Sequence, residues 1–256
     1  MNTNKNLKIS IIGIGNGGCN IISHLTNKNF SQVELIAIDV NLQLFNEIKS
    51  VKQFELKKSL DLGLNSILED DLSSENFRNI KGNLKENDVV FIVSTLGGET
   101  GIYVPSMVAE ISREVCPIII SIVTTPFNWE GKKREERAIL SIEKLKIFCD
   151  LLIVIPNEKL LEIISENFDA EKTFELLDES FFQTIHSLID KINMQDNNEN
   201  IKNILLQKKF VLNYKEHILG TSIFYDSLNK TSDLESIEIK LNRNNKKWKF
   251  MHNILN

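Results

Sequence analysis

Residues 7–20, Leu-Lys-Ile-Ser-Ile-Ile-Gly-Ile-Gly-Asn-Gly-Gly-Cys-Asn, decide the fold of this chain. Leu7 to Gly13 is a short run rich in β-branched apolar residues, which is typical of a buried strand. Glycines follow at once, and the apolar residues from Ile21 to Leu25 have helical spacing. The segment therefore predicts a strand, a glycine-rich turn and a helix, and a second strand is expected at 33–39.

The same alternation continues along the chain. Apolar runs at 88–94, 117–123 and 151–155 predict further strands, and helical periodicity predicts helices at about 104–115 and 132–149. Residues 52–87 are more polar, and only a solvated helix that begins near Ser73 is expected there. Strands that alternate with helices indicate an α/β fold with a parallel sheet covered on both faces. Ligands bind at the carboxyl edge of such sheets, where the glycine-rich segments of this chain fall.

The pattern changes after residue 168. A long helix is expected over 169–192, with Asp169 as its N-cap. A polar stretch at 195–200 ends it, and strand-like runs follow at 210–212, 218–224 and 237–241. The chain therefore divides into 1–168, 169–192 and 193–256.

Composition limits the classes of function. The 256 residues, 42% of them hydrophobic, suffice for one large domain and a small appendage. A formal net charge of −5 argues against a nucleic-acid partner, and the apolar runs are too short for direct membrane insertion. Three scattered cysteines and no signal peptide favour a cytoplasmic location. The histidines show no metal-ligand spacing, and we treat them as structural: His24, His186, His217 and His252.

The glycine loops allow two functional interpretations. Gly13-x-Gly15-x-x-Gly18, with Asp39 about twenty residues on, fits the dinucleotide fingerprint and predicts an NAD-dependent Rossmann oxidoreductase. A tight strand-to-helix turn without a ligand is the structural alternative. However, a second glycine cluster, 97–101, follows another strand. Two such loops cradle one polyphosphate from two sides, and an NAD site does not need the second.

Several motifs occur in an order that resembles one known family. They are Ile-Gly-Ile-Gly-Asn-Gly-Gly-Cys-Asn (12–20), Ala-Ile-Asp-Val-Asn-Leu-Gln (37–43), Gly-Gly-Glu-Thr-Gly (97–101), Pro-Ser-Met-Val-Ala-Glu (105–110), Thr-Pro-Phe-Asn-Trp-Glu-Gly-Lys-Lys-Arg (125–134), Ile-Pro-Asn-Glu-Lys-Leu-Leu (155–161) and Phe-Glu-Leu-Leu-Asp (174–178). Over roughly residues 7–206 the chain resembles the FtsZ/tubulin family of cell-division GTPases. The resemblance implies a parallel, Rossmann-like GTPase domain over 1–168, a long central helix over 169–192 and a reduced, partly β C-terminal appendage over 193–256.

The resemblance also implies a ligand and partners. GTP or GDP would bind across the strand ends, with Mg²⁺ as a further cofactor. The partners would be a second copy of the chain or a division-ring FtsZ, at a cytoplasmic division site. The residues that would bind the nucleotide are Gly15, Asn16, Gly17, Gly18, Asn20, Gly97, Gly98, Thr100, Gly101, Glu130, Arg134, Asn157, Phe174 and Asp178.

Three of these implied contacts have simpler alternatives. Asp178 would accept hydrogen bonds from N1–H and the 2-amino group of guanine, because a carboxylate is an acceptor only. The alternative is a solvated helix residue. Phe174 would stack on the base, but it also lies on an apolar helical stripe that suits core packing. Glu130 and Arg134 match ribose and phosphate contacts, but their spacing also suits a surface ion pair.

Other positions depart from the family pattern. Glu99 replaces the third glycine of the signature, and two like charges about 4 Å apart repel by roughly 4 kcal/mol at a dielectric constant of 20. Its side chain would turn away, reach the nucleotide through Mg²⁺, or weaken binding of the terminal phosphate. Asp39 and Asn41 are exchanged relative to the family's Asn-Thr-Asp order, so Asp39 would be a second acid near the nucleotide.

The acids that activate water in the family are the largest departure. One register places Gln195, Asn197 and Asn200 at those positions, and amides cannot act as bases. A shift by one residue offers Asp196 and Glu199 instead. We therefore expect weak or lost GTP hydrolysis, with a fully active GTPase as the alternative, and GDP binding at least as tight as GTP binding.

Overall fold

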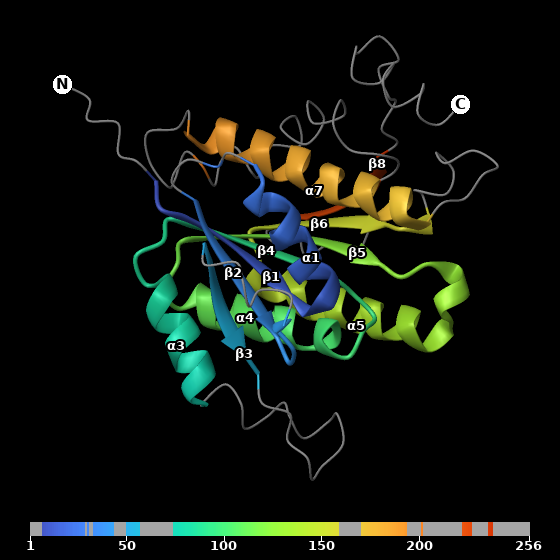
Figure 1. Cartoon of the computed structure of the whole chain (residues 1–256), viewed down its shortest axis with the longest axis horizontal. Helices are drawn as coiled ribbons and strands as arrows, with labels where there is room; N and C mark the ends of the chain where they lie inside the picture. Colours follow the sequence, from blue (N-terminus) through green and yellow to red (C-terminus); the bar gives the residue numbers. More distant parts are fainter. Residues whose placement is uncertain are drawn as a thin grey trace.

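The computed structural model describes residues 7–28, 30, 33–43, 50–56, 74–158, 170–193, 201, 222–226 and 235–237. Its strands form one sheet in the order β3-β2-β1-β4-β5-β6-β7-β8 (Figure 1). The first six in this order pair in parallel, while β7 pairs antiparallel with β6 and β8 antiparallel with β7. The strands are β1 (Ile9–Ile14), β2 (Val33–Asp39), β3 (Val51–Glu55), β4 (Val89–Thr95), β5 (Ile118–Thr125), β6 (Leu151–Pro156), β7 (Ser222–Asp226) and β8 (Glu235–Ile237).

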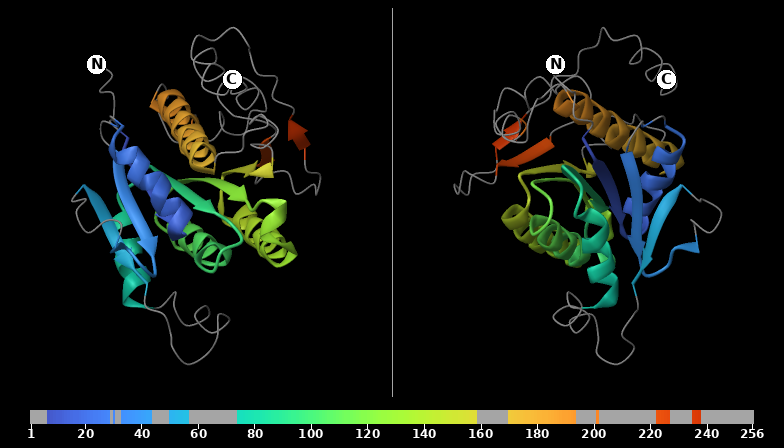
Figure 2. Two further views of the ribbon diagram at one scale, coloured as in Figure 1. Left: turned by 45° about the vertical axis from the view of Figure 1, so that its right-hand side comes forward. Right: turned by 90° about the vertical axis from the view of Figure 1, so that its left-hand side faces the viewer.

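Helices cover both faces of this sheet (Figures 1 and 2). Helices α1 (Gly15–Thr26) and α7 (Ala170–Asn193) lie on one face. Helices α3 (Glu75–Leu84), α4 (Val104–Arg113) and α5 (Lys132–Phe148) lie on the other. In the part of the chain that the structure describes, no helix has the length and apolar character needed to cross a membrane.

Strand β1 explains why the first apolar run predicted the fold. Ile9 and Ile11 belong to the hydrophobic cluster shared with α1 and α7. Ile12 and Ile14 belong to the cluster shared with α3, α4 and α5. Because successive side chains point to opposite faces and both faces are covered, a parallel strand here is mostly apolar. The buried Ser10 hydroxyl of β1 is hydrogen-bonded to Glu34 and Asn87. The predicted α/β fold with a parallel sheet is confirmed.

Several predicted boundaries agree closely with the structure. The central helix, expected at 169–192, is observed as Ala170–Asn193, and the strand expected at 33–39 is β2. The helix expected near Ser73 begins at Glu75, where Ser74 Oγ accepts a hydrogen bond from the Phe77 amide. At the C-terminal side, β7 shares residues 222–224 with the run expected at 218–224 and ends two residues beyond it, and β8 shares only Ile237 with the run expected at 237–241. The run expected at 210–212 lies outside the described residues.

One strand was missed. Residues 51–55 were interpreted as part of a polar segment, but they form β3, the edge strand beside β2. Lys52, Gln53 and Glu55 are exposed, and only Val51 is buried. An edge strand has a neighbour on one side only, so a largely polar sequence suffices for it and the apolar signal is weak.

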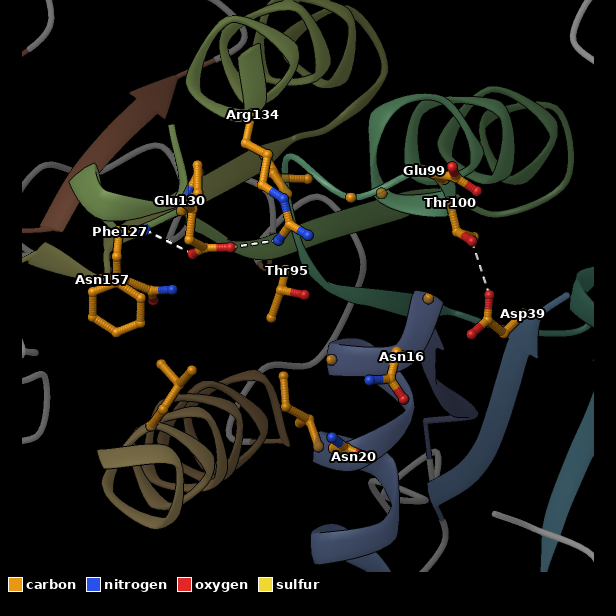
Figure 3. A pocket seen from close by; sticks show the side chains of 18 of the residues that line it. Asn16, Asn20, Asp39, Thr95, Glu99, Thr100, Phe127, Glu130, Arg134 and Asn157 are labelled. Carbon is orange, nitrogen blue, oxygen red and sulfur yellow. Dashed lines mark hydrogen bonds and ion pairs between the residues drawn. The ribbon is translucent and has the colours of Figure 1, made fainter. Parts of the chain in front are cut away.

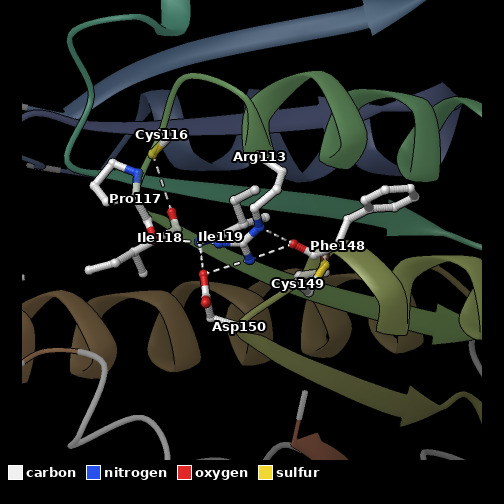
Figure 4. A network of polar contacts seen from close by, with 9 residues as sticks. Arg113, Cys116, Pro117, Ile118, Ile119, Phe148, Cys149 and Asp150 are labelled. Carbon is white, nitrogen blue, oxygen red and sulfur yellow. Dashed lines mark hydrogen bonds and ion pairs between the residues drawn. The ribbon is translucent and has the colours of Figure 1, made fainter. Parts of the chain in front are cut away.

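The amino edge of the sheet is closed by a polar network (Figure 4). Arg113, the last residue of α4, donates to the Phe148 carbonyl oxygen from Nε at 2.9 Å and forms an ion pair with Asp150 at 2.8 Å. Asp150 Oδ2 also accepts from the Ile119 amide at 2.8 Å. Arg113 and Asp150 together thus tie the ends of α4 and α5 to the beginnings of β5 and β6.

Candidate functional site

A cavity of about 780 Å³ lies at the opposite, carboxyl edge of the sheet (Figure 3). Its walls come from the ends of β2 and β4, from the segments that follow β4, β5 and β6, and from helices α1, α5 and α7. This is the location predicted from the positions of the glycine-rich segments. The structure brings most of the expected nucleotide-binding residues into its lining: Gly15, Asn16, Gly17, Asn20, Gly98, Thr100, Gly101, Glu130, Arg134, Asn157 and Asp178.

The first glycine loop brings the start of α1 against β4. Gly15 has a φ of +72°, which a residue with a side chain rarely adopts. A Cβ on Gly17 would lie 2.2 Å from Thr95 Oγ1, and one on Gly18 would lie 2.6 Å from the Val93 oxygen. Gly18 is not part of the lining, and its contact with β4 indicates a packing role. Because no side chain caps α1 at Ile14, the first amides of this helix form an anion-binding end.

The second glycine loop follows β4 and faces the first. Gly97 has a φ of +94°, and a Cβ there would lie 2.9 Å from the Arg134 oxygen. It therefore shapes the loop from outside the lining. Thr100 begins the short 3₁₀ turn η3 (Thr100–Ile102) and lies in the cavity wall. A Cβ on Gly15 would lie 3.4 Å from Thr100 Cβ, so the two loops meet at this point.

Two carboxylates lie near this meeting point. Asp39, at the end of β2, is only 7% exposed, and its Oδ1 accepts from Thr100 Oγ1 and from the Val40 amide, each at 2.8 Å. Glu99 also lines the cavity, but it is exposed to solvent. Water screens the charge of Glu99 far more than that of Asp39. The structure therefore places the buried acid at Asp39, which the sequence singled out as a second acid.

The wall of the cavity opposite the glycine loops carries the polar groups that were expected to contact the nucleoside. Asn157, just after β6, is 5% exposed, and its Oδ1 has no hydrogen-bond partner among the described residues. Asp178 on α7 is half-buried, and burial raises the pKa of its carboxyl to about 6, opposed by nearby His24 and assisted by Glu175. Phe174 lies on the same helix, but its side chain is outside the described part of the structure.

Glu130 and Arg134 form the expected ion pair, and both lie in the cavity wall. Arg134 Nη1, from the first turn of α5, donates to Glu130 Oε2 at 2.5 Å. Glu130 Oε1 also accepts from the Phe127 amide at 2.9 Å. Glu130 ends the 3₁₀ turn η4 (Asn128–Glu130), so this contact holds the turn against the cavity.

The sequence did not single out every lining residue. Trp129 lies at the wall with 58% exposure, and its ring stacks on Phe127 with centroids 4.2 Å apart and 9° between the planes. Two aromatic residues beside Pro126 in the 125–134 motif were the available signal. The other additions are mostly apolar or backbone positions: Ile21, Val40, Thr95, Leu96, Pro126 and Leu177.

The predicted water-activating residues cannot be placed. Asp196, Glu199, Asn197 and Asn200, together with Gln195, lie outside the described residues. Within the described ranges, no group of three or more His, Cys, Asp or Glu side chains is arranged to hold a metal ion.

Fold and cavity together define an α/β protein with two glycine loops facing one pocket at a sheet edge. Comparison with known proteins identifies the family. Residues 8–165 match the model of the tubulin/FtsZ family, GTPase domain. The chain is 34% identical over 189 residues to cell division protein FtsZ 1 of Methanocaldococcus jannaschii, covering 72% of this chain and 52% of that protein. It is also 34% identical over 195 residues to cell division protein FtsZ of Buchnera aphidicola, covering 73% of this chain and 51% of the relative.

Solved structures agree with this assignment. An empty FtsZ dimer of M. jannaschii superposes with a TM-score of 0.65 at 33% identity, over 75% of this chain and 57% of the other. The GTPγS-bound protofilament of CetZ2 from Haloferax volcanii gives a TM-score of 0.63 at 17% identity, over 77% and 63% of the two chains, and so shows the fold alone.

The chain belongs to the tubulin/FtsZ family. The resemblance expected from the motifs is confirmed, and these findings give no support to the NAD-dependent oxidoreductase. The chain spans about half the length of the curated relatives it matches.

Proposed function

We propose that this chain is an FtsZ-like protein of cell division that binds GTP or GDP in the cavity at the carboxyl edge of its sheet. The observation that carries the proposal is the buried Asn157 Oδ1, which lines the cavity without a partner among the described residues. A buried acceptor of this kind costs free energy unless a ligand donates to it. The nucleoside of a guanine nucleotide supplies such donors.

Asp178 supports the choice of guanine. Its carboxylate is partly desolvated, which is why its pKa is raised. Guanine presents N1–H and the 2-amino group side by side, and both donate to a carboxylate. Adenine has an acceptor at N1 and no 2-amino group, so it leaves the desolvated carboxylate without these bonds.

The two glycine loops would hold the phosphates. The amides of Gly15, Asn16 and Gly17 lie at the N-terminus of α1, which favours an anion. Gly98 and Thr100 line the opposite side. Arg134 supplies a cation to the lining, although it is paired with Glu130.

Hydrolysis would be weak or absent. The proposal rests on the register in which Asn197 and Asn200 replace the family's acids, since an amide does not accept the proton of an attacking water. Phosphate release from GTP at a rate near the uncatalysed background is expected. Brisk turnover that is lost in Asp196→Ala or Glu199→Ala would establish the other register and an active GTPase.

Membership of the family supports the cellular role, and FtsZ of M. jannaschii has been solved as a dimer. We propose that this chain associates with itself or with a division-ring FtsZ at the cytoplasmic division site.

The test of the ligand is a thermal-shift series with GDP, GTP, ATP and NAD. A ligand at a hundred times its Kd stabilises the folded state by about 2.7 kcal/mol. We expect GDP and GTP to raise the Tm and ATP and NAD to leave it unchanged. A shift with NAD alone would contradict the proposal.

Asp178→Asn tests the base contact. Asparagine offers one acceptor and one donor, which match N1–H and the 2-oxo group of xanthine. We expect GDP affinity to fall by about tenfold or more and xanthosine diphosphate affinity to rise. Glu175→Gln, an exposed change on the same helix, is the matched control and should leave both affinities unchanged. Wild-type GDP binding by Asp178→Asn would contradict the assignment.

A further inference from the structure

The hydrogen bond between Asp39 and Thr100 spans the phosphate end of the cavity (Figure 3). Asp39 ends β2 and Thr100 lies just beyond β4, while β1 lies between these strands in the sheet. The bond therefore passes over the point where β1 ends and α1 begins. Gly15 lies directly beside it, since a Cβ there would be 3.4 Å from Thr100 Cβ.

The carboxylate is fixed in this position. Asp39 is 7% exposed, and its Oδ1 receives two hydrogen bonds of 2.8 Å, one from the Thr100 hydroxyl and one from the Val40 amide. Bonds to an ionised acceptor are about twice as strong as those between neutral groups. Asp39 thus holds a negative charge at the cavity wall, beside the anion-binding end of α1.

Thr100 can serve only one acceptor at a time. A hydroxyl has a single proton to donate. While that proton is directed to Asp39, it is not available to a phosphate oxygen, and a phosphate that replaced Asp39 would also approach its buried charge. An additional phosphate group therefore meets a competing internal anion.

Glu99 is less suited to this role although it is the more obvious sequence departure. It is exposed, and water and salt screen its charge. Asp39 is buried and hydrogen-bonded to a residue of the second glycine loop. Because Asp39 is buried and Glu99 is exposed, we attribute the repulsion of an additional phosphate group to Asp39.

We propose that Asp39 is a specificity-determining residue that competes with the terminal phosphate for Thr100 and so selects a nucleoside diphosphate over a triphosphate. The inference rests on the proposed binding of guanine nucleotides in this cavity. To that proposal it adds a residue inside the site that discriminates between diphosphate and triphosphate. Removing the charge from Asp39 should therefore relieve the discrimination without harming the base contacts.

The experiment measures Kd for GDP and GTP by calorimetry, with and without added Mg²⁺, in the full chain and in Asp39→Asn. Asparagine keeps the size and the acceptor but removes the charge. We expect the ratio Kd(GTP)/Kd(GDP) to fall by about tenfold, with the GDP affinity nearly unchanged. Asp39→Ser, a second neutral variant, should give the same change if Asp39→Asn does not fold. Glu99→Gln tests the competing acid and should change the ratio by less than about threefold. Glu55→Gln, an exposed change on β3 opposite Asp39 and outside the cavity lining, is the matched control and should leave both affinities unchanged.

The outcomes separate the two proposals. An unchanged ratio in both neutral variants, or GTP binding weakened more than GDP binding, overturns the role of Asp39. Weakening that appears only with Mg²⁺ would mean that the carboxylate supports a bound metal rather than competing with phosphate. If the wild-type chain binds neither guanine nucleotide, the proposed function itself fails. If it binds both and only the ratio is unmoved by substitution, the proposed function stands and this inference falls.

Discussion

The two edges of the same parallel sheet are built in opposite ways. At the amino edge, polar groups are paired: Asp88 Oδ2 accepts from the Lys8 amide at 3.0 Å, and Asp150 binds Arg113 and the Ile119 amide. At the carboxyl edge, Thr124 Oγ1 and Asn157 Oδ1 are buried without partners among the described residues. Buried polar groups that are hydrogen-bonded stabilise a fold, and buried polar groups without a partner destabilise it until a ligand supplies the hydrogen bond. The comparison predicts that substitutions at the two edges affect different properties.

Arg113→Ala should give the largest loss of stability. The substitution removes the ion pair to Asp150 and the hydrogen bonds to the Phe148 carbonyl, and it leaves a largely buried carboxylate without its cation. Breaking such a pair costs about 2–4 kcal/mol, given that Arg113 keeps some exposure to water. Urea unfolding measures the loss, and GDP affinity of the folded variant should stay at the wild-type value. A loss below about 0.5 kcal/mol would mean that the network at this edge is not stabilising.

Asn157→Ala should weaken GDP binding while leaving the stability of the nucleotide-free protein nearly unchanged. The orphan Oδ1 has no hydrogen bond to lose among the described residues, so the free energy of unfolding without nucleotide should change by no more than about 1 kcal/mol. GDP affinity should fall by about tenfold, which calorimetry measures.

Ser94→Ala is the comparison variant for Asn157. Ser94 is equally buried, but its hydroxyl donates to the Ile14 carbonyl oxygen at 2.9 Å. Its loss should therefore cost about 1 kcal/mol of stability. Equal losses of stability in the two variants would show that Asn157 is an ordinary structural residue.

The prediction of these edges from sequence was uneven. Strands such as β1 and β5 are buried on both faces, so their apolar runs were unmistakable. The order of the motifs predicted that Gly15 and Asp178 lie at one site, and both line the cavity. Strand β3 was missed because only Val51 on it is buried, and an edge strand leaves little apolar signal.

Contacts between distant segments were beyond sequence reasoning. The bond from Thr100 to Asp39 joins residues 61 positions apart, and the ion pair from Arg113 to Asp150 joins residues 37 positions apart. Each depends on how strands are ordered in the sheet. Gly18 shows the same limit, because its motif position did not indicate the close packing on β4, where a Cβ would lie 2.6 Å from the Val93 oxygen. Spacing alone cannot separate a glycine that lines a cavity from one that allows packing.

The pH dependence of the carboxyl edge should have opposite signs for binding and stability. Burial raises the pKa of Asp178 to about 6 in the folded protein, above its ordinary value of 3.8. In the proposed site guanine would donate to the ionised carboxylate, so GDP affinity should fall by up to about tenfold between pH 7 and pH 5. Without nucleotide, the folded state binds this proton more tightly than the unfolded state. The contribution of Asp178 to stability therefore rises as pH falls from above 6 toward 3.8 and is lost as pH rises through 6.

Asp178→Asn removes the titrating carboxyl and so separates its contribution to the pH dependence from that of other residues. Calorimetry and urea unfolding across the same pH range, compared between the wild type and the variant, should show both dependences only in the wild type. The same pH profile in the two proteins would assign the titration to another residue.

Lys81→Ala should have the smallest effect and tests why the amino edge is stable. Lys81 on α3 pairs with Glu114, the residue after Arg113, at 2.5 Å, but the two side chains are 34% and 57% exposed. Exposed pairs contribute about 0–1 kcal/mol and weaken further in salt. We expect a loss below about 0.5 kcal/mol in urea unfolding, and none at high ionic strength. A loss as large as that of Arg113→Ala would mean that pairing itself stabilises this edge. The expected small loss instead attributes the stability to burial and to the backbone carbonyl that Arg113 reaches and Lys81 does not.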